Sequence, residues 1–157
     1  MVSIVTVYRE NADIFQEYWL PLIFKHGPVE FIIVDNASIY SKLSAPALPN
    51  LKTIRSPEEV ERNKARKLGV SKSKSDIIFL CTMKAVPTYE TMVLLESVKE
   101  NQMLFPSWIN LDRNIKIPTT NKNSFSVERN KYLACDENEY ISTYEPEVLY
   151  KGTLYYV

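Results

Sequence analysis

Short apolar runs alternate with helical patterns along this chain. The segments Val2–Tyr8 and 31–34 have the composition of buried strands. The chain between them carries apolar residues three and four positions apart, which predicts a helix that ends near Gly27 and Pro28. The apolar positions of that helix are Ile14, Phe15, Tyr18, Trp19, Leu22 and Ile23.

Further strands are expected later in the chain. Residues 51–54 predict a short third strand, and the apolar run at residues 77–80 is typical of a central strand covered on both faces. Residues 104–111 predict another strand region. Residues 112–124 are polar and lack periodicity, which predicts a mobile loop that lies over an acceptor.

Two helices are predicted on either side of the central strand. The first covers residues 59–70, with Ser56 as its N-cap and Glu59 completing a capping box. The second begins near Thr88, and its core-facing positions are Met92, Leu95 and Val98. This alternation predicts an α/β fold with crossover units around a mixed, mostly parallel central sheet.

Composition narrows the classes of function. A chain of 157 residues suits one domain over residues 1–157 with its own core. Its 19 basic residues balance 19 acidic ones, so no global charge favours nucleic acid as a partner. The three glycines argue against a glycine-rich phosphate loop.

The cysteines and the single histidine indicate a reducing compartment without a zinc site. Cys81 and Cys135 are widely separated, no signal peptide is visible, and no apolar stretch reaches the roughly 20 residues of a membrane span. We therefore expect a cytoplasmic protein, with attachment at a membrane surface left open. Cys81 is expected to be a buried structural thiol rather than a nucleophile. His26 is expected to cap a helix or lie at the surface.

Candidate chemistry follows two of the predicted strands. The carboxyl ends of parallel strands form the usual ligand crevice of such sheets. Asp35 and the segment from Cys81 to Lys84 come directly after strands, so we expect them at the same edge. On the basic helix, Arg62 and Arg66 lie four positions apart and share one face. They are either solvated or available to a phosphate.

Five segments that cover nearly the whole chain carry a resemblance to a known family. They are VSIVTVYRE, EFIIVDNAS, ARKLGVSKSKSDIIFL, VPTYETMVLLESV and CDENEYISTYEPEVLYKGTLYYV. Their order resembles that of the family 2 inverting glycosyltransferases. The resemblance implies the GT-A fold, a Rossmann-like three-layer sandwich with a mixed, mostly parallel central sheet.

The resemblance also implies a site for the nucleotide base. Tyr8 would stack on the base, and Asp35 would accept a hydrogen bond from a ring nitrogen. The residues alone allow a simpler interpretation of Asp35. An Asp-Asn pair after a strand commonly forms a turn that is stabilised by side-chain bonds to its own backbone.

The carboxyl-terminal part of the chain concentrates the acids. They are Asp136, Glu137, Glu139, Glu145 and Glu147. Such a stretch is either a solvated loop or the source of a general base. By the resemblance, Glu145 aligns with the catalytic base that takes the proton of the acceptor hydroxyl, and Glu147 with a supporting acid. The alternative for Glu145 is an exposed N-cap, with Pro146 at the first position of a short helix.

The chain departs from the family at its Asp-X-Asp metal motif. Here it has Cys81, Thr82 and Met83. Magnesium and manganese prefer oxygen ligands, so we expect no metal cofactor, with Mg²⁺ or Mn²⁺ as a weak alternative. Lys84, with Arg62 or Arg66, is predicted to supply positive charge to the departing diphosphate. The alternative is a decayed site in which Lys84 points to solvent.

These observations leave three functional hypotheses, of which the third is an unrelated nucleotide-binding α/β protein that matches the family in fold only. The first is a glycosyltransferase that moves a sugar, with inversion, from a nucleoside-diphosphate sugar to a hydroxyl of a glycan, lipid or protein. The second is a catalytically inactive relative that binds a nucleotide sugar or a partner protein. The tyrosine-rich end at Tyr155 and Tyr156 is a plausible contact surface, which leaves a homo-oligomer open.

Overall fold

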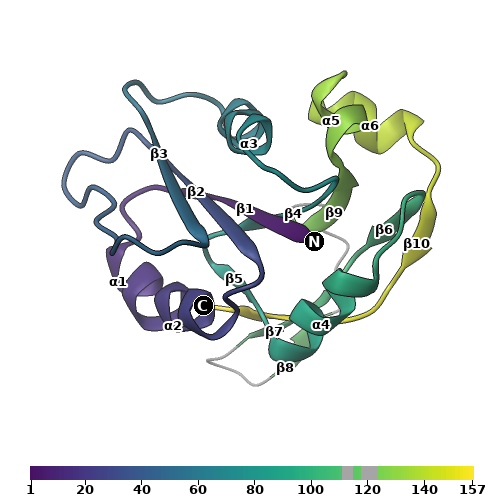
Figure 1. The fold of residues 1–157 in the computed structure, drawn as a ribbon, viewed down its shortest axis with the longest axis horizontal. Coiled ribbons are helices and arrows are strands. Elements are labelled where there is room, and N and C mark those ends of the chain that lie inside the picture. The colour runs from purple at the N-terminus through teal and green to yellow at the C-terminus, as the bar shows by residue number, and fades with distance from the viewer. Residues whose placement is uncertain (111–114, 118–123) are drawn as a thin grey trace.

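The computed structural model describes residues 1–110, 115–117 and 124–157. A twisted sheet forms its centre (Figure 1). Its strands are β1 (Val2–Tyr8), β2 (Glu30–Asn36), β3 (Leu51–Ser56), β4 (Ile77–Thr82) and β9 (Phe125–Glu128). They lie in the order β3-β2-β1-β4-β9. The first four are parallel and β9 is antiparallel to β4, so the predicted mixed, mostly parallel sheet is confirmed.

Helices cover both faces of this sheet. They are α1 (Ala12–Ile14), the π-helical turn η1 (Phe15–Trp19), α2 (Leu20–Lys25), α3 (Arg62–Ser71), α4 (Tyr89–Ser97), α5 (Arg129–Leu133) and α6 (Glu137–Thr143). Figure 1 shows α3 and α5 on one side of the sheet and the α1–α2 region with α4 on the other. The helix predicted between the first two strands therefore forms, and it ends at its C-cap His26.

Alternate residues of the strands feed two separate cores. On one face Ile4, Phe31 and Phe79 pack with Trp19 of η1 and with α4. On the other face Val5, Ile32, Ile78 and Leu80 pack with Val70 of α3 and with Tyr132 and Tyr140 of α5 and α6. Both faces are apolar because both are covered, as expected for a parallel sheet. The result is a three-layer sandwich.

Two smaller sheets complete the described part of the fold. One has the order β5-β11-β7-β8. Its strands are β5 (Ala85–Pro87), β7 (Ser107–Asn110), β8 (Ile115–Ile117) and β11 (Thr153–Tyr156). The other pairs β6 (Gln102–Leu104) with β10 (Glu147–Leu149). No helix within the described residues is both long enough and apolar enough to cross a membrane.

The predicted capping box is wrong. Strand β3 continues to Ser56, and α3 begins only at Arg62, with Glu61 at its N-cap. The ladder with β2 extends to the pair Asn36 and Ser56. The Asn36 side chain then bonds the backbone of Val60 through both its oxygen and its nitrogen, at 3.0 and 2.9 Å. These bonds keep the connection between β3 and α3 out of helical structure, so Ser56 is not the N-cap of α3.

The predicted helix after Glu145 is also wrong. Residues Glu147–Leu149 form strand β10, which runs parallel to β6. The Glu147 N–H donates to the Asn101 carbonyl at 2.8 Å, and the Phe105 N–H donates to the Leu149 carbonyl at 2.9 Å. These long-range backbone bonds outweigh the local preference of the Glu145-Pro146 pair for a helix start.

The strand region predicted at 104–111 and the loop predicted at 112–124 are only partly described. Strands β6 and β7 take up the first region, while residue 111 lies outside the described residues. Within the second, residues 112–114 and 118–123 lie outside them, and Ile115–Ile117 pairs with β7 as β8. The expected continuous loop is therefore interrupted by a strand.

Gly69 allows α3 to approach the sheet closely. A Cβ atom there would lie 2.5 Å from Val5 Cγ1 and 3.1 Å from Val34 Cγ2. Gly69→Ala should therefore lower the free energy of unfolding by about 1–3 kcal/mol through overpacking, as measured by urea unfolding. Gly27→Ala is the matched control, since nothing lies within 4 Å of a Cβ there. Equal stability of the two variants would contradict this packing.

Candidate functional site

The candidate site is the crevice outside the carboxyl ends of β1, β2 and β4. Val7 of β1 pairs with Val34 of β2 and with Thr82 of β4, so these three strands end together. Asp35 and Met83 therefore lie at the same end of the sheet, the carboxyl end of its parallel strands, as expected. This is the end of the sheet at which open α/β proteins bind ligands.

A cavity of about 290 Å³ opens at the ends of β1 and β4. Its lining residues are Val7, Asn11, Thr82, Met83, Lys84, Trp108 and Tyr156. Two hydrogen bonds to backbone carbonyls hold the segment after β4 in place. The Trp19 indole donates to the Met83 carbonyl at 2.7 Å, and the Val157 N–H donates to the Lys84 carbonyl at 2.9 Å. The exposed Lys84 side chain thus extends from an anchored backbone.

A second cavity, of about 300 Å³, lies beside the first. It is lined by Glu10, Asn11, Ala12, Asp13, Ile14 and Ser41. Asn11 lines both cavities, so they are neighbours along the same edge. A ligand with two parts joined by a short linker can occupy both.

Asp35 is almost completely buried, with 3% of its surface exposed. One carboxylate oxygen accepts the Ser38 N–H at 3.0 Å. The other accepts the Leu43 N–H at 3.0 Å and the Arg55 guanidinium at 2.8 Å. Burial raises the pKa of this carboxyl, but the bonds from Leu43 and Ser38 and the charge of Arg55 outweigh it, so the pKa is lowered. This geometry agrees with the interpretation of Asp35 as a turn residue, because donors within the protein occupy both of its carboxylate oxygens.

Glu10 organises the loop that follows β2. One of its carboxylate oxygens accepts the N–H groups of Ile39 and Tyr40, and the other accepts the N–H and hydroxyl of Ser41. Desolvation raises the pKa of Glu10, but the bonds from Ser41, Ile39 and Tyr40 outweigh it and lower the pKa. Glu10 itself has a φ of 53°, a left-handed backbone that non-glycine residues rarely adopt. The hydrogen bonds of Glu10 therefore hold the loop beside the second cavity in one conformation.

Tyr8 lies inside the protein rather than on the crevice. Only 1% of its surface is exposed, and its ring contacts Phe15 edge to face. Its hydroxyl donates to the Ser41 carbonyl at 2.6 Å. In this position the ring has no free face for a base, and the hydroxyl supports the loop that Glu10 also holds.

The two candidate arginines of α3 have different surroundings. Arg62, the first residue of α3, is exposed. Arg66 is completely buried, and its guanidinium bonds the Glu137 carboxylate of α6 at 3.0 Å. Tyr132 of α5 donates to the other oxygen of that carboxylate at 2.7 Å. Arg66 therefore joins α3 to α5 and α6 and is not presented to a phosphate.

Glu145 and Glu147 lie near the opposite end of the sheet from Lys84. Both are exposed, and the Glu147 carboxylate accepts the Gln102 amide at 3.0 Å. Glu147 bonds the backbone of Asn101, whose N–H reaches Glu128 at 3.3 Å. Glu128 pairs with Ile77, the first residue of β4, whereas Lys84 follows its last residue.

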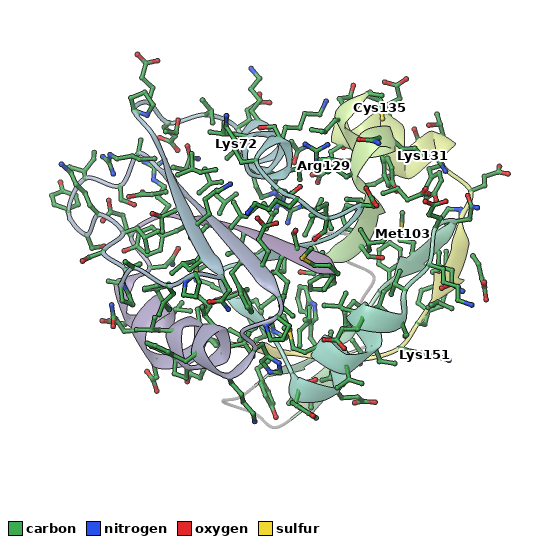
Figure 2. The ribbon with its side chains drawn as sticks, in the orientation of Figure 1. Lys72, Met103, Arg129, Lys131, Cys135 and Lys151 are labelled. Carbon is green, nitrogen blue, oxygen red and sulfur yellow. The ribbon has the colours of Figure 1, made fainter. Side chains whose placement is uncertain are left out.

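Strand β10, which follows Glu145, lies far from the loop that follows β2 (Figure 1). Strand β10 runs along one margin of the molecule, and the loop after β2 lies at the other (Figure 1). Figure 2 labels Met103 of β6 and Lys131 of α5 on the β10 side. The structure does not bring Glu145 together with Lys84. The role of Glu145 as a base stays a prediction without support from this arrangement.

The residues at the carboxyl end of β4 do not fit a divalent cation. Within residues 1–110, 115–117 and 124–157, no group of three or more His, Cys, Asp or Glu side chains is placed to hold a metal. At the position of the family's metal motif, Cys81 and Met83 are buried. Cys81 has no exposed surface, as expected of a structural thiol, and this burial raises its pKa to about 12. Soft, protonated sulfur is a poor ligand for Mg²⁺ or Mn²⁺.

Sequence reasoning did not assign several residues to the candidate site at the carboxyl ends of the strands. Glu10 and Arg55 gave no signal, because their partners are backbone groups about 30 residues away or a carboxylate on a neighbouring strand. Trp108 and Tyr156 line the first cavity from β7 and β11. The only signal for Tyr156 was the period of a strand in TLYY, which places Leu154 and Tyr156 on one face, and Trp108 gave no signal.

Comparisons with known proteins identify the fold. No family model matches the chain, and no curated protein matches its sequence. Among solved structures, the mannosyltransferase PcManGT from Pyrobaculum calidifontis, in complex with GDP-Man and Mn²⁺, superposes with a TM-score of 0.70 at 12% identity, over 98% of this chain and 56% of that one.

Two further structures agree. S. aureus TarS 1–349 in complex with UDP-GlcNAc gives a TM-score of 0.74 at 12% identity, over 98% of this chain and 57% of that one. GalNAc-T7 with UDP, GalNAc and Mn²⁺ gives a TM-score of 0.65 at 13% identity, over 99% of this chain and 43% of that one. This chain thus spans about half the length of these proteins. At such low identity they establish the fold, which is the GT-A fold of glycosyltransferases.

Proposed function

We propose that this chain is a glycosyltransferase-like protein that binds a nucleoside-diphosphate sugar without a tightly bound metal. The observation that carries the proposal is the pair of adjoining cavities at the carboxyl ends of β1, β2 and β4. They lie at the ligand edge of a fold whose neighbours were solved with GDP-Man or UDP-GlcNAc.

Lys84 is the group proposed to meet the diphosphate. It is exposed at the first cavity, and no carboxylate among the described residues forms an ion pair with it. A lysine supplies a point charge to phosphate oxygens and needs no metal to do so. Arg62, exposed at the start of α3, is a second candidate for this charge. Arg66 is not, since Glu137 neutralises it inside the protein.

The proposed reaction is transfer of the sugar, with inversion, to a hydroxyl of a glycan, lipid or protein. In such a transfer a base removes the proton of the acceptor hydroxyl as its oxygen attacks the anomeric carbon, and the nucleoside diphosphate leaves from the opposite face. Lys84 would stabilise the charge that develops on the leaving diphosphate.

A second candidate function is binding of the nucleotide sugar without transfer. One observation favours it: Glu145, the predicted base, and Glu147, the predicted supporting acid, lie near the amino end of β4. Incubation with UDP, GDP and dTDP sugars separates the two functions. Transfer or donor hydrolysis supports an enzyme, whereas tight binding without either supports a binding protein.

Lys84→Ala should weaken binding of the preferred nucleotide sugar by about 5- to 30-fold, because an exposed charge-assisted hydrogen bond contributes roughly 1–2 kcal/mol. EDTA should change the affinity of the wild type less than twofold. Calorimetry with the panel of UDP, GDP and dTDP sugars, with and without Mn²⁺, measures both effects.

Two control variants accompany Lys84→Ala. Lys72→Ala removes an exposed lysine just after α3 (Figure 2). Lys52, near the start of β3, donates to the Lys72 carbonyl, so Lys72 lies at the amino end of the sheet and its loss should leave affinity unchanged. Glu145→Gln should likewise leave donor affinity unchanged, whatever its effect on turnover. Binding that requires Mn²⁺ and ignores Lys84→Ala would contradict the proposal.

A further inference from the structure

Two aromatic side chains form one wall of the first cavity. The rings of Trp108 and Tyr156 stack with centroids 5.1 Å apart and planes 5° from parallel. Both residues are half-buried, and both line the cavity with Lys84. An aromatic pair that is packed in this way presents a rigid apolar surface, since each ring restricts the rotation of the other.

The register of the small sheet explains why these rings meet. Strands β7 and β11 are parallel, and Trp108 lies opposite Leu154. Tyr156 stands two residues beyond Leu154, so it projects from the same face as Trp108. Tyr155 projects from the other face, where 40% of its surface is exposed. The sequence order Leu-Tyr-Tyr thus places one tyrosine at the cavity and one away from it.

The cavity combines this wall with few polar groups and one charge. Among the described residues that line it, Asn11 and Thr82 supply hydrogen-bonding groups, Lys84 supplies a positive charge, and none carries a carboxylate. At about 290 Å³ it lies at the lower end of the range for small-ligand sites, roughly 300–1,000 Å³. It therefore suits one part of a nucleoside-diphosphate sugar rather than the whole molecule.

We infer that the Trp108 and Tyr156 pair forms the subsite for the sugar ring of the donor. A pyranose ring presents C–H groups on its faces and hydroxyl groups around its rim. The C–H groups pack on an electron-rich aromatic face, and the hydroxyls meet polar groups such as Asn11 and Thr82. With its phosphate at Lys84, the ring occupies the first cavity, and the nucleoside extends past Asn11 into the second.

This inference rests on the proposed function, and the two make different predictions. Nucleotide binding alone requires the second cavity and a cation. The sugar subsite requires that the sugar itself adds affinity through Trp108 and Tyr156. The diagnostic quantity is therefore the ratio of affinities for a nucleotide sugar and for the same nucleoside diphosphate.

The chain contains two tryptophans, which suits an NMR test. The indole N–H of Trp19 is buried and bonded to the Met83 carbonyl, whereas Trp108 lines the cavity. In ¹⁵N spectra, UDP-N-acetylglucosamine or GDP-mannose should shift the Trp108 indole signal more than UDP or GDP does. The signals are assigned with Trp108→Phe. Methyl glycosides of the same sugars, at millimolar concentration, probe the subsite without any nucleotide.

Three variants complete the test. Trp108→Leu and Tyr156→Leu should each reduce the affinity for the nucleotide sugar by about 3- to 10-fold and leave that for the nucleoside diphosphate unchanged. Tyr155→Leu is the matched control on the other face of β11 and should change neither. An unshifted Trp19 signal in each variant shows that the fold is retained.

The outcomes separate the two proposals. If the diphosphate binds as tightly as its sugar conjugate, or if the advantage of the sugar survives Trp108→Leu, the subsite is refuted and nucleotide binding stands. If methyl glycosides shift the Trp108 signal but no nucleotide binds, the aromatic pair binds a sugar but is not a donor subsite, and the proposed function fails. If no ligand of either kind binds, both fail.

Discussion

Glu137→Ala should lower the free energy of unfolding by about 3–5 kcal/mol, because it removes the carboxylate that pairs with the buried Arg66 guanidinium. The Arg66 side chain has no exposed surface, and 4% of the Glu137 side chain is exposed, so water cannot replace the lost carboxylate. The Tyr132 hydroxyl loses its acceptor at the same time. Urea unfolding at neutral pH measures the loss.

Two further variants make this prediction specific. Glu139→Ala removes an exposed acid from the same helix and should change stability by less than about 0.5–1 kcal/mol. The double variant Arg66→Met with Glu137→Leu replaces the pair by apolar side chains and should recover most of the stability. A double variant as unstable as Glu137→Ala would show that the loss comes from packing and not from the charge of Arg66.

Asp35→Ala should lower the free energy of unfolding by about 2–4 kcal/mol, since the N–H groups of Ser38 and Leu43 lose a charged acceptor. It should also weaken nucleotide binding by about 1–3 kcal/mol if Asp35 meets a base. Arg55→Ala, which removes one partner of Asp35 and is itself partly exposed, serves as a milder comparison. Lost stability with unchanged affinity would assign Asp35 to the turn alone.

The stabilisation by Asp35 depends on pH with a definite sign. Its pKa in the folded protein lies below the ordinary value of 3.8, so the folded state holds the charged form more strongly than the unfolded state does. The contribution is complete above about pH 5 and is lost as the pH falls below 3.8 and through the folded pKa. The difference in stability between the wild type and Asp35→Asn should therefore shrink between pH 5 and 2. A difference that grows on acidification would contradict the assignment.

The central sheet was predictable because its strands are locally apolar. Residues 31–34 and 77–80 are continuous hydrophobic runs, and such runs form strands wherever helices cover both faces. Strand β9 was missed for the opposite reason. It reads FSVE, and its polar residues are buried with distant partners: Ser126 accepts the Leu104 N–H, and Glu128 accepts the Asn101 N–H. Local periodicity carries no information about such partners.

The site was predictable in place but not in detail. Right-handed crossovers between parallel strands put Asp35 and Met83 at one edge whatever their side chains do. Which side chains face the crevice depends on contacts across long stretches of sequence. Arg66 looked like a solvated residue of a basic helix, yet it pairs with a carboxylate 71 positions away. Tyr8 ends an apolar strand, and the loop that covers it comes more than 30 residues later.

Strand β3 forms one edge of the central sheet, and this has a consequence for solubility. An edge strand exposes backbone N–H and carbonyl groups that can template the addition of a strand from another molecule. Here Lys52 places a positive charge on that strand, and Pro49 stands just before it. A second copy that approached edge to edge would bring its own like charge into contact. The chain therefore carries built-in protection against growth into extended β-aggregates through β3.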